Sequence, residues 1–288
     1  MIKLSKTFQY KAIKTWFKIG GALTPRLTAR IAYQAFFTRP LRQIPLPSDI
    51  KLLDMATVLN RQFEKRWLRG YIWGDSGKQV ILAHGWNSYA LAMRELIVPL
   101  VECGFQVIAF DAPAHGHSEG IRTSGPQYRR CLAELLANFH PYAIIGHSLG
   151  GICALSALQD LKQVETSKVI TLAAPINSQA LVKRFLEYTN LHRFSHHHFQ
   201  RYIERHLEIT PTQFDLQYLY PEGINYSGLI IHDLNDSVIP YAEALKLANI
   251  WPQAGLITTI GLEHSGVLKD GEIIKQIIEF IASKNNSR

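Results

Sequence analysis

A serine with glycines on both sides is the first residue whose setting suggests chemistry. Residues 146–151 read Gly-His-Ser-Leu-Gly-Gly, between an apolar run at 142–146 and a helical pattern at 149–162. A serine hydroxyl becomes a nucleophile only when a base accepts its proton and its oxygen is held toward the substrate. A sharp turn from strand to helix holds the oxygen in this way, and glycines two residues to either side remove side chains that would clash. We therefore expect Ser148 to be a nucleophile.

This hexapeptide resembles the nucleophile turn of the α/β-hydrolase family. The resemblance implies a catalytic triad in the chain order serine, acid, histidine. His264 is the only histidine after residue 236 and follows the last predicted strand, so it is expected to be the base. The stretch 232–240 resembles the family's H-D-x-x-D-x-x-V-P motif, whose second acid, Asp236, is expected to orient His264. Two acids compete with it, but Asp233 suits a turn and Glu263 is expected to point away from its neighbour.

A second loop, His84-Gly85-Trp86, follows the apolar run at 79–83 and resembles the family's H-G oxyanion loop. The attacked carbonyl oxygen gains negative charge, and the backbone N–H groups of Trp86 and Leu149 are the expected donors to it. Gly85 lets the backbone approach closely, and His84 is expected to brace the loop. Gly85, Trp86 and His147 are predicted to line the substrate pocket. Core packing remains the alternative for the Trp86 ring.

A third loop, at residues 111–118, resembles the family's D-x-P-G-H-G-x-S segment, with Ala114 where glycine is usual. In the family this segment mostly shapes the site. Structural roles are therefore expected for Asp111, His115 and His117.

The elements that must position these loops alternate along the chain. Short apolar strands separated by helical stretches are typical of a parallel sheet with helices on both faces. We predict an α/β-hydrolase fold with a mostly parallel sheet, a helical cap insertion at 176–227 and a core formed by 49–175 and 228–288. The predicted strands are 67–73, 79–83, 105–110, 142–146, 168–173, 228–233 and 256–260. The predicted helices of the core are 89–102, 125–138, 149–162, 241–250 and 270–283.

The N-terminal arm, residues 1–48, holds nine lysines and arginines and no acid. Without the arm, 22 basic and 23 acidic residues remain, so the excess charge of +8 belongs to the arm and not to a nucleic-acid-binding face of the core. Two helices are expected in it, at about 5–19 and from Thr24-Pro25 onward, followed by a proline-rich linker. Its aromatic residues are expected to pack against the main domain or a second subunit. Peripheral membrane contact is the alternative. These aromatic residues are Phe8, Trp16, Phe17, Phe36 and Phe37.

The remaining composition excludes several classes of protein. The chain is 47% hydrophobic, and it has no 18-residue apolar run and no signal-peptide pattern, so a cytoplasmic location is expected, with membrane association as the alternative. Cys103, Cys131 and Cys153 lie in apolar segments and are expected to be buried and reduced. The histidines at 192–206 lack the spacing of metal ligands, and no nucleotide-binding motif occurs. We expect neither a metal nor a cofactor.

These features together predict a serine hydrolase that cleaves a carboxylic ester or thioester through an acyl-enzyme. Lipase, C–C bond hydrolase and acyltransferase activities use the same residues and stay open. The rival from another class is a non-catalytic binding protein on the same fold, because a fold does not fix a function.

Overall fold

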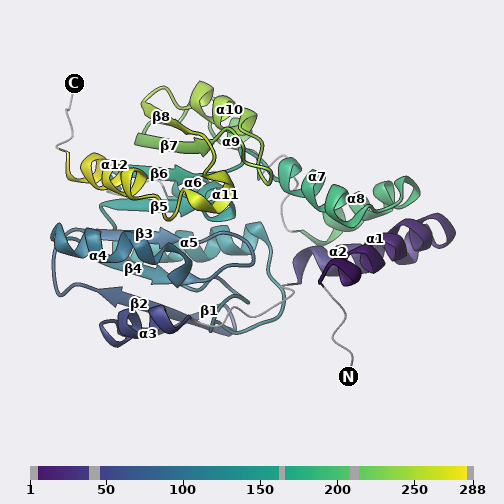
Figure 1. Cartoon of the computed structure of the whole chain (residues 1–288), viewed down its shortest axis with the longest axis horizontal. Helices are drawn as coiled ribbons and strands as arrows, with labels where there is room; N and C mark the ends of the chain where they lie inside the picture. The colour runs from purple at the N-terminus through teal and green to yellow at the C-terminus, as the bar shows by residue number, and fades with distance from the viewer. Residues whose placement is uncertain (1–5, 39–45, 162–165, 208–213, 284–288) are drawn as a thin grey trace.

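Eight strands form a single sheet in the order β1-β2-β4-β3-β5-β6-β7-β8 (Figure 1). The computed structural model describes residues 6–38, 46–161, 166–207 and 214–283. Strand β2 pairs antiparallel with β1 and with β4, and the other five neighbouring pairs are parallel. The strands are β1 (Thr57–Phe63), β2 (Arg66–Trp73), β3 (Gln79–Ala83), β4 (Gln106–Phe110), β5 (Ala143–His147), β6 (Lys168–Leu172), β7 (Ser227–Asp233) and β8 (Ala254–Thr259).

Helices cover both faces of this sheet. Successive side chains of a strand point to opposite faces, so Ile81 and Ile144 join one apolar cluster while Val80 and Ile145 join the other. The first face is covered by α5 (Gly125–Phe139), α6 (Leu149–Asp160), α9 (Leu216–Leu219) and α10 (Ala242–Ile250). The second face is covered by α3 (Pro47–Asp54), η1 (Ala90–Met93), α4 (Arg94–Glu102) and α12 (Gly271–Ala282). This is the α/β-hydrolase arrangement that the sequence predicts.

All seven predicted strands are present, but the sequence analysis missed β1 and α3. Strand β1 is an edge strand whose seven residues are mostly exposed, so it lacks the buried apolar run that identifies the others. Helix α3 begins at Pro47, which we had assigned to a linker. The buried Asp49 carboxylate ties this helix to η1 and α4, because it accepts hydrogen bonds from Tyr89 Oη at 2.9 Å and from Arg94 Nη1 at 2.8 Å.

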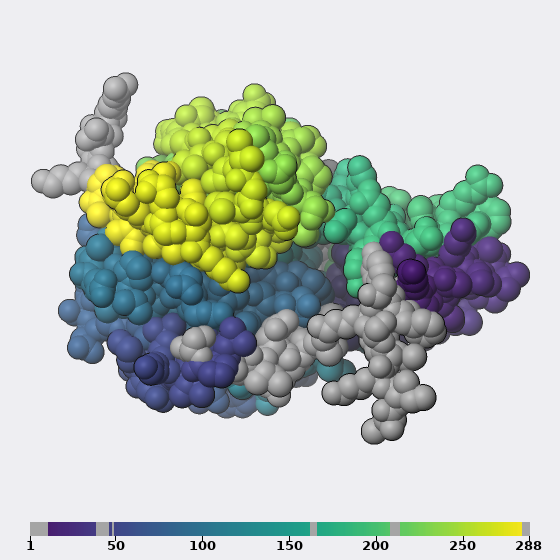
Figure 2. Space-filling view, in the orientation of Figure 1, coloured from purple at the N-terminus to yellow at the C-terminus, as the bar shows by residue number. Residues whose placement is uncertain are grey.

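The apolar residues of the N-terminal arm pack mainly against the cap, which corrects part of the prediction. The end of the arm also contacts the α/β core, because the Phe37 carbonyl accepts the Thr123 N–H at 3.1 Å. Helices α1 (Lys6–Leu23) and α2 (Pro25–Phe37) lie beside α7 (Ser178–Thr189) and α8 (Arg193–His206) at one end of the molecule (Figures 1 and 2). They share a third apolar cluster with its own buried residues, and we call this four-helix unit the arm–cap layer. The buried members are Phe17, Ala29, Ala32, Phe37, Leu191, Phe199 and Ile203.

The other described aromatic residues of the arm are either packed against the cap or exposed. Phe36 stacks edge-on against Phe185 and Phe199, with ring centroids 5.0 and 5.8 Å apart, whereas Trp16 is 47% exposed. The side chain of Phe8, and the linker prolines Pro40 and Pro45, lie outside the described residues. No helix in the described ranges is both long and apolar enough to cross a bilayer.

The helical insertion is shorter than the predicted cap at 176–227. Phe214, Leu216, Tyr220 and Ile224 pack into the first core cluster, and Tyr220 Oη donates a hydrogen bond to the Leu155 carbonyl at 2.6 Å. Among the described residues of this insertion, only α7 and α8 therefore lie outside the core.

The three cysteines are unpaired. Cys131 and Cys153 are buried, as expected, and Cys103 is exposed at the end of α4, contrary to the prediction.

Candidate active site

Ser148 stands at a strained turn between β5 and α6. Its backbone angles are φ 51° and ψ −121°, a region that side chains other than glycine rarely enter. The two glycines of the motif relieve the crowding around it. A Cβ on Gly146 would lie 2.5 Å from the Gly151 Cα, and a Cβ on Gly150 would collide with the Ala83 carbonyl. This strained conformation places the Ser148 hydroxyl at the carboxyl edge of the sheet, beside the positive end of α6.

His264 connects Ser148 to Asp236. Its Nε2 lies 3.1 Å from Ser148 Oγ, and its Nδ1 lies 2.8 Å from Asp236 Oδ2. Asp236 follows β7, and His264 lies in the short helix α11 (Glu263–Gly266) that follows β8, so three strand ends bring the groups together. This geometry fits the tautomer in which Nδ1–H donates to the carboxylate and Nε2 accepts the serine proton. Ser148 and Asp236 are buried, and the His264 side chain keeps 15% of its surface exposed.

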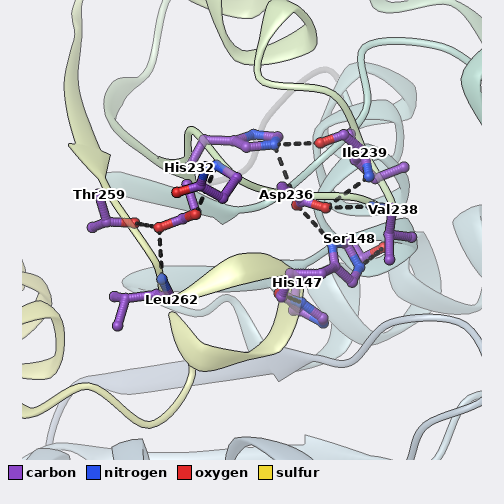
Figure 3. A network of polar contacts seen from close by, with 11 residues as sticks. His147, Ser148, His232, Asp236, Val238, Ile239, Thr259 and Leu262 are labelled. Carbon is purple, nitrogen blue, oxygen red and sulfur yellow. Dashed lines mark hydrogen bonds and ion pairs between the residues drawn. The ribbon is translucent and has the colours of Figure 1, made fainter.

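The Asp236 carboxylate is held from both sides (Figure 3). Its Oδ1 accepts the backbone N–H groups of Val238 at 2.7 Å and Ile239 at 2.8 Å. On the other side, His232 Nε2 lies 3.4 Å from Oδ2, the oxygen that His264 also contacts. Burial alone would raise the pKa of Asp236, but the hydrogen bonds from His232, His264 and the backbone outweigh it and hold the pKa well below its usual value. The acid is therefore a fixed anion.

The His84-Gly85-Trp86 loop approaches Ser148 closely. A Cβ on Gly85 would lie 3.0 Å from His147 Nδ1 and 3.1 Å from Ser148 Cβ, so a larger residue would have to push these neighbours aside. His84 braces the loop, because its Nδ1 lies 2.7 Å from the Gly85 carbonyl and its Nε2 accepts the Ala112 N–H at 2.9 Å. Within the described ranges, the backbone N–H groups of Trp86 and Leu149 have no hydrogen-bond acceptor. Both groups are thus free to donate to a ligand.

This geometry agrees with the comparison to known proteins. The family model described as serine aminopeptidase, S33, matches residues 74–220, which is just over half of the chain. The chain belongs to this α/β-hydrolase family. The match includes Ser148 and the His84-Gly85-Trp86 loop but ends before Asp236 and His264. Those two residues are identified by their distances to each other and to Ser148.

Individual relatives resemble this α/β-hydrolase over shorter stretches. A serine hydrolase-like protein of Danio rerio is 37% identical over 123 residues, which is 37% of each chain. The uncharacterized hydrolase YugF of Bacillus subtilis is 32% identical over 107 residues, or 35% of this chain and 38% of YugF. The matches thus span little more than a third of these two relatives. The structure of the Pyrococcus furiosus esterase Pf2001 shares the fold, with a TM-score of 0.64, 22% identity and coverage of 85% of this chain and 97% of that one.

His147, predicted only to line the pocket, connects two of the site's loops in this α/β-hydrolase. Its ring lies 4.9 Å from the His264 ring, and its Nε2–H donates to the His264 backbone carbonyl at 3.0 Å. Burial, followed by the nearby His264, lowers the pKa of His147 to about 3. The ring is therefore neutral near pH 7. Its N–H donates a hydrogen bond that fixes the position of the His264 backbone.

His232 is the site residue that sequence reasoning missed. It is fully buried at the end of β7, where its Nε2–H donates to the Ile239 carbonyl at 2.9 Å and faces Asp236. Its Nδ1 has no hydrogen-bond partner among the described residues. The signal was present, because His232 is the first residue of the motif that supplied Asp236.

The competing acids occupy other positions. Asp233 Oδ2 accepts hydrogen bonds from Thr259 Oγ1 at 2.7 Å and from the Leu262 N–H at 2.9 Å, so it fixes the loop that carries His264. Glu263 is exposed and has a φ of 56°. Asp111, likewise, accepts the backbone N–H groups of Ala90 and His117, each at 2.8 Å, and thereby shapes the neighbouring loop. These three acids have no contact with Ser148.

The described residues contain no group of three or more histidine, cysteine, aspartate or glutamate side chains that could hold a metal ion. The cap histidines contact the backbone around them instead. His196 Nε2 lies 2.8 Å from the Leu191 carbonyl, and His206 Nδ1 lies 2.9 Å from the Tyr202 carbonyl.

Proposed function

We propose that this protein is a serine hydrolase that cleaves a carboxylic ester or thioester. The observation that carries the proposal is the pair of contacts of His264, at 3.1 Å to Ser148 and 2.8 Å to Asp236. A histidine placed in this way accepts a proton from serine on one side and is stabilised as a cation by a carboxylate on the other. Membership of the S33 family and the likeness in fold to an esterase support the proposal.

In the proposed reaction, Ser148 Oγ attacks the carbonyl carbon of the substrate while His264 Nε2 takes the serine proton. The carbonyl oxygen becomes an oxyanion, to which the N–H groups of Trp86 and Leu149 donate. The tetrahedral intermediate then collapses, the C–O or C–S bond breaks, and His264 passes its proton to the leaving alcohol or thiol. Water next attacks the acyl-enzyme with His264 as its base, the carboxylic acid leaves, and Ser148 regains its proton.

Asp236 and the two buried histidines prepare the groups for this sequence. Asp236 keeps His264 in the reactive tautomer, and its low pKa means that it does not take the proton itself. His232 holds the loop that carries Asp236, and His147 holds the segment that carries His264. Gly85, Trp86 and His147 are proposed to border the substrate. The residues of the turn, the loop and the triad are thus proposed as one preorganised unit.

A fluorophosphonate probe tests the proposal directly, because it forms a covalent bond only with an activated serine. We expect labelling of the wild-type protein and none of Ser148→Ala. Absence of labelling in both proteins would instead favour a binding protein on the same fold. A panel of chromogenic esters and thioesters with acyl chains of increasing length then defines the preferred substrate and separates an esterase from a lipase.

A further inference from the structure

A cationic cavity lies in the arm–cap layer, on elements that contribute no residue to the proposed triad. It has a volume of about 220 Å³ and is lined by Arg26 of α2 and by His198, Arg201, Tyr202 and Arg205 of α8. The four α8 residues occupy positions i, i+3, i+4 and i+7 and so share one face of that helix. Arg26 reaches the same cavity because α2 packs along α8. Two segments that are distant in the sequence thus build one site.

The positive charges of this cavity are not neutralised within the described part of the protein. Arg26, Arg201 and Arg205 form no ion pair or side-chain hydrogen bond with any described residue, and no acid lines the cavity. Arg94 and Arg129, by contrast, each pair with an acid, Asp49 and Asp160 respectively. Glu204 is the only acid in α8, and it does not face the cavity. Three exposed guanidinium groups therefore lie around one cavity without a counter-ion among the described residues.

The surroundings keep the charges in this arrangement. Phe199 and Ile203 on α8 pack against Ala29 and Ala32 on α2, so the helices cannot separate to relieve the repulsion without exposing this apolar cluster. The pKa of His198 is lowered, first by burial and then by the nearby Arg26, His197 and Arg201, which is the expected response to a positive potential. An anion that entered the cavity would remove the repulsion.

We propose that this cavity binds a phosphate group. The planar guanidinium fork matches phosphate oxygens in a bidentate manner, and three forks with an imidazole and a phenol suit a doubly charged anion. A cavity of about 220 Å³ is smaller than the roughly 300 to 1,000 Å³ of a drug-sized pocket, so it holds an anionic group rather than a whole ligand. The proposal goes beyond ester hydrolysis and does not depend on it.

The rest of such a ligand has room along the same helix pair. Tyr33 of α2 lies 5.9 Å from the Tyr202 ring and 5.3 Å from the His206 ring, measured between centroids. Tyr33 and His206 also line a second cavity of about 250 Å³ that extends to Phe37 and to Ser124 at the start of α5. The rings of Tyr33, Tyr202 and His206 thus lie between the phosphate cavity and this second cavity.

Calorimetric titration of the full-length protein with inorganic pyrophosphate at 0.15 M ionic strength tests the site. We expect saturable binding that is at least tenfold weaker in Arg201→Gln. Arg193→Gln is the matched control, because Arg193 lies on the same helix outside the cavity and the substitution removes the same charge. Its affinity is expected to stay within twofold of wild type. Equal losses in the two variants would overturn the proposal.

A second arm of the experiment identifies the source of the phosphate. Sedimentation with vesicles of phosphatidylcholine that contain 20% phosphatidic acid is compared with sedimentation with phosphatidylcholine alone. Vesicle binding that Arg201→Gln reduces and Arg193→Gln does not would assign a lipid headgroup. Pyrophosphate binding without vesicle binding would assign a soluble phosphate ester. Failure in both arms would overturn the proposal and leave the hydrolase proposal untouched.

Discussion

The α/β core and the arm–cap layer differ in whether their charged side chains have partners within the protein. At the candidate active site, the Asp236 carboxylate is surrounded by two backbone N–H groups and two histidines, all within 3.4 Å. In the arm–cap layer, three arginines line one cavity, and no acid lies among the described residues that line it. The first arrangement is complete without a ligand and fixes the positions of reacting groups. The second is incomplete without one, which is why we assign catalysis to the core and anion binding to the layer.

Removal of the negative charge of Asp236 should have the largest effect, because it disrupts the hydrogen bonds that hold His264 and the carboxylate in place. Asp236→Asn keeps the volume of the side chain but lets the amide donate, so His264 loses its reactive tautomer. We expect kcat on a chromogenic ester to fall by about 10⁴-fold. Asp233→Asn is the matched control, since it alters the neighbouring acid that touches only the loop. A greater loss of kcat in the Asp233 variant would reverse the assignment of the acid.

Disruption of the arm–cap cluster tests whether the two regions are independent. Phe199→Ala removes a buried ring between α2 and α8 and is expected to lower the local free energy of unfolding by about 3 to 5 kcal/mol. Hydrogen exchange of the α8 amides should speed up accordingly, while fluorophosphonate labelling of Ser148 continues. The core substitution Leu155→Ala is the control and should slow the labelling while the exchange of the α8 amides stays unchanged. Loss of labelling in the Phe199 variant alone would show that the layer helps to form the site.

A smaller effect is expected where one hydrogen bond connects two loops of the core. His147→Leu removes the donor to the His264 carbonyl, and we expect kcat to fall by about 10- to 100-fold with little change in KM. His147→Gln retains an N–H donor and should recover part of the rate. Because the pKa of His147 is about 3, the acid limb of the pH–rate profile should persist in both variants. Disappearance of that limb would make His147 itself the base.

Acid stability gives the smallest expected difference. The pKa of Asp236 is lower in the folded protein than in the unfolded chain, so its ionised form stabilises the fold. That contribution is fully present above the unfolded pKa of about 4 and is lost as the pH falls toward the folded value. Between pH 4 and pH 2, the stability of wild type should decline more steeply than that of Asp236→Asn, by up to about 1.4 kcal/mol per pH unit. Parallel curves from chemical denaturation would contradict the low pKa.

The same contrast explains what the sequence could predict. In the core, Ser148, Asp236 and His264 each lie within five residues of the end of a strand, and the parallel sheet brings those strand ends to one edge. Their spacing was therefore enough to foresee that they meet. His232 escaped notice because nothing in the motif shows that its ring turns toward Asp236 and not toward solvent.

The arm–cap layer offered no comparable signal. Arg26 and Arg201 are 175 positions apart, and they meet only because the apolar stripes of α2 and α8 fit each other. Helical periodicity predicts that a stripe exists but not which partner covers it. The arm's aromatic residues are accordingly predicted to pack on the main domain or a second subunit, whereas the structure packs Phe17, Phe36 and Phe37 on the cap. Edge strand β1 was missed for a related reason, since exposed residues carry little pattern.

The rate at which a fluorophosphonate reacts with Ser148, compared between wild type and His264→Ala, tests the central claim most directly. Mass spectrometry of the digested protein locates the adduct, and the second-order rate constant reports activation of the serine by its base. We predict one adduct, on Ser148, that forms at least about 10³-fold more slowly in the variant. An adduct on a different residue, or equal rates in the two proteins, would contradict the account.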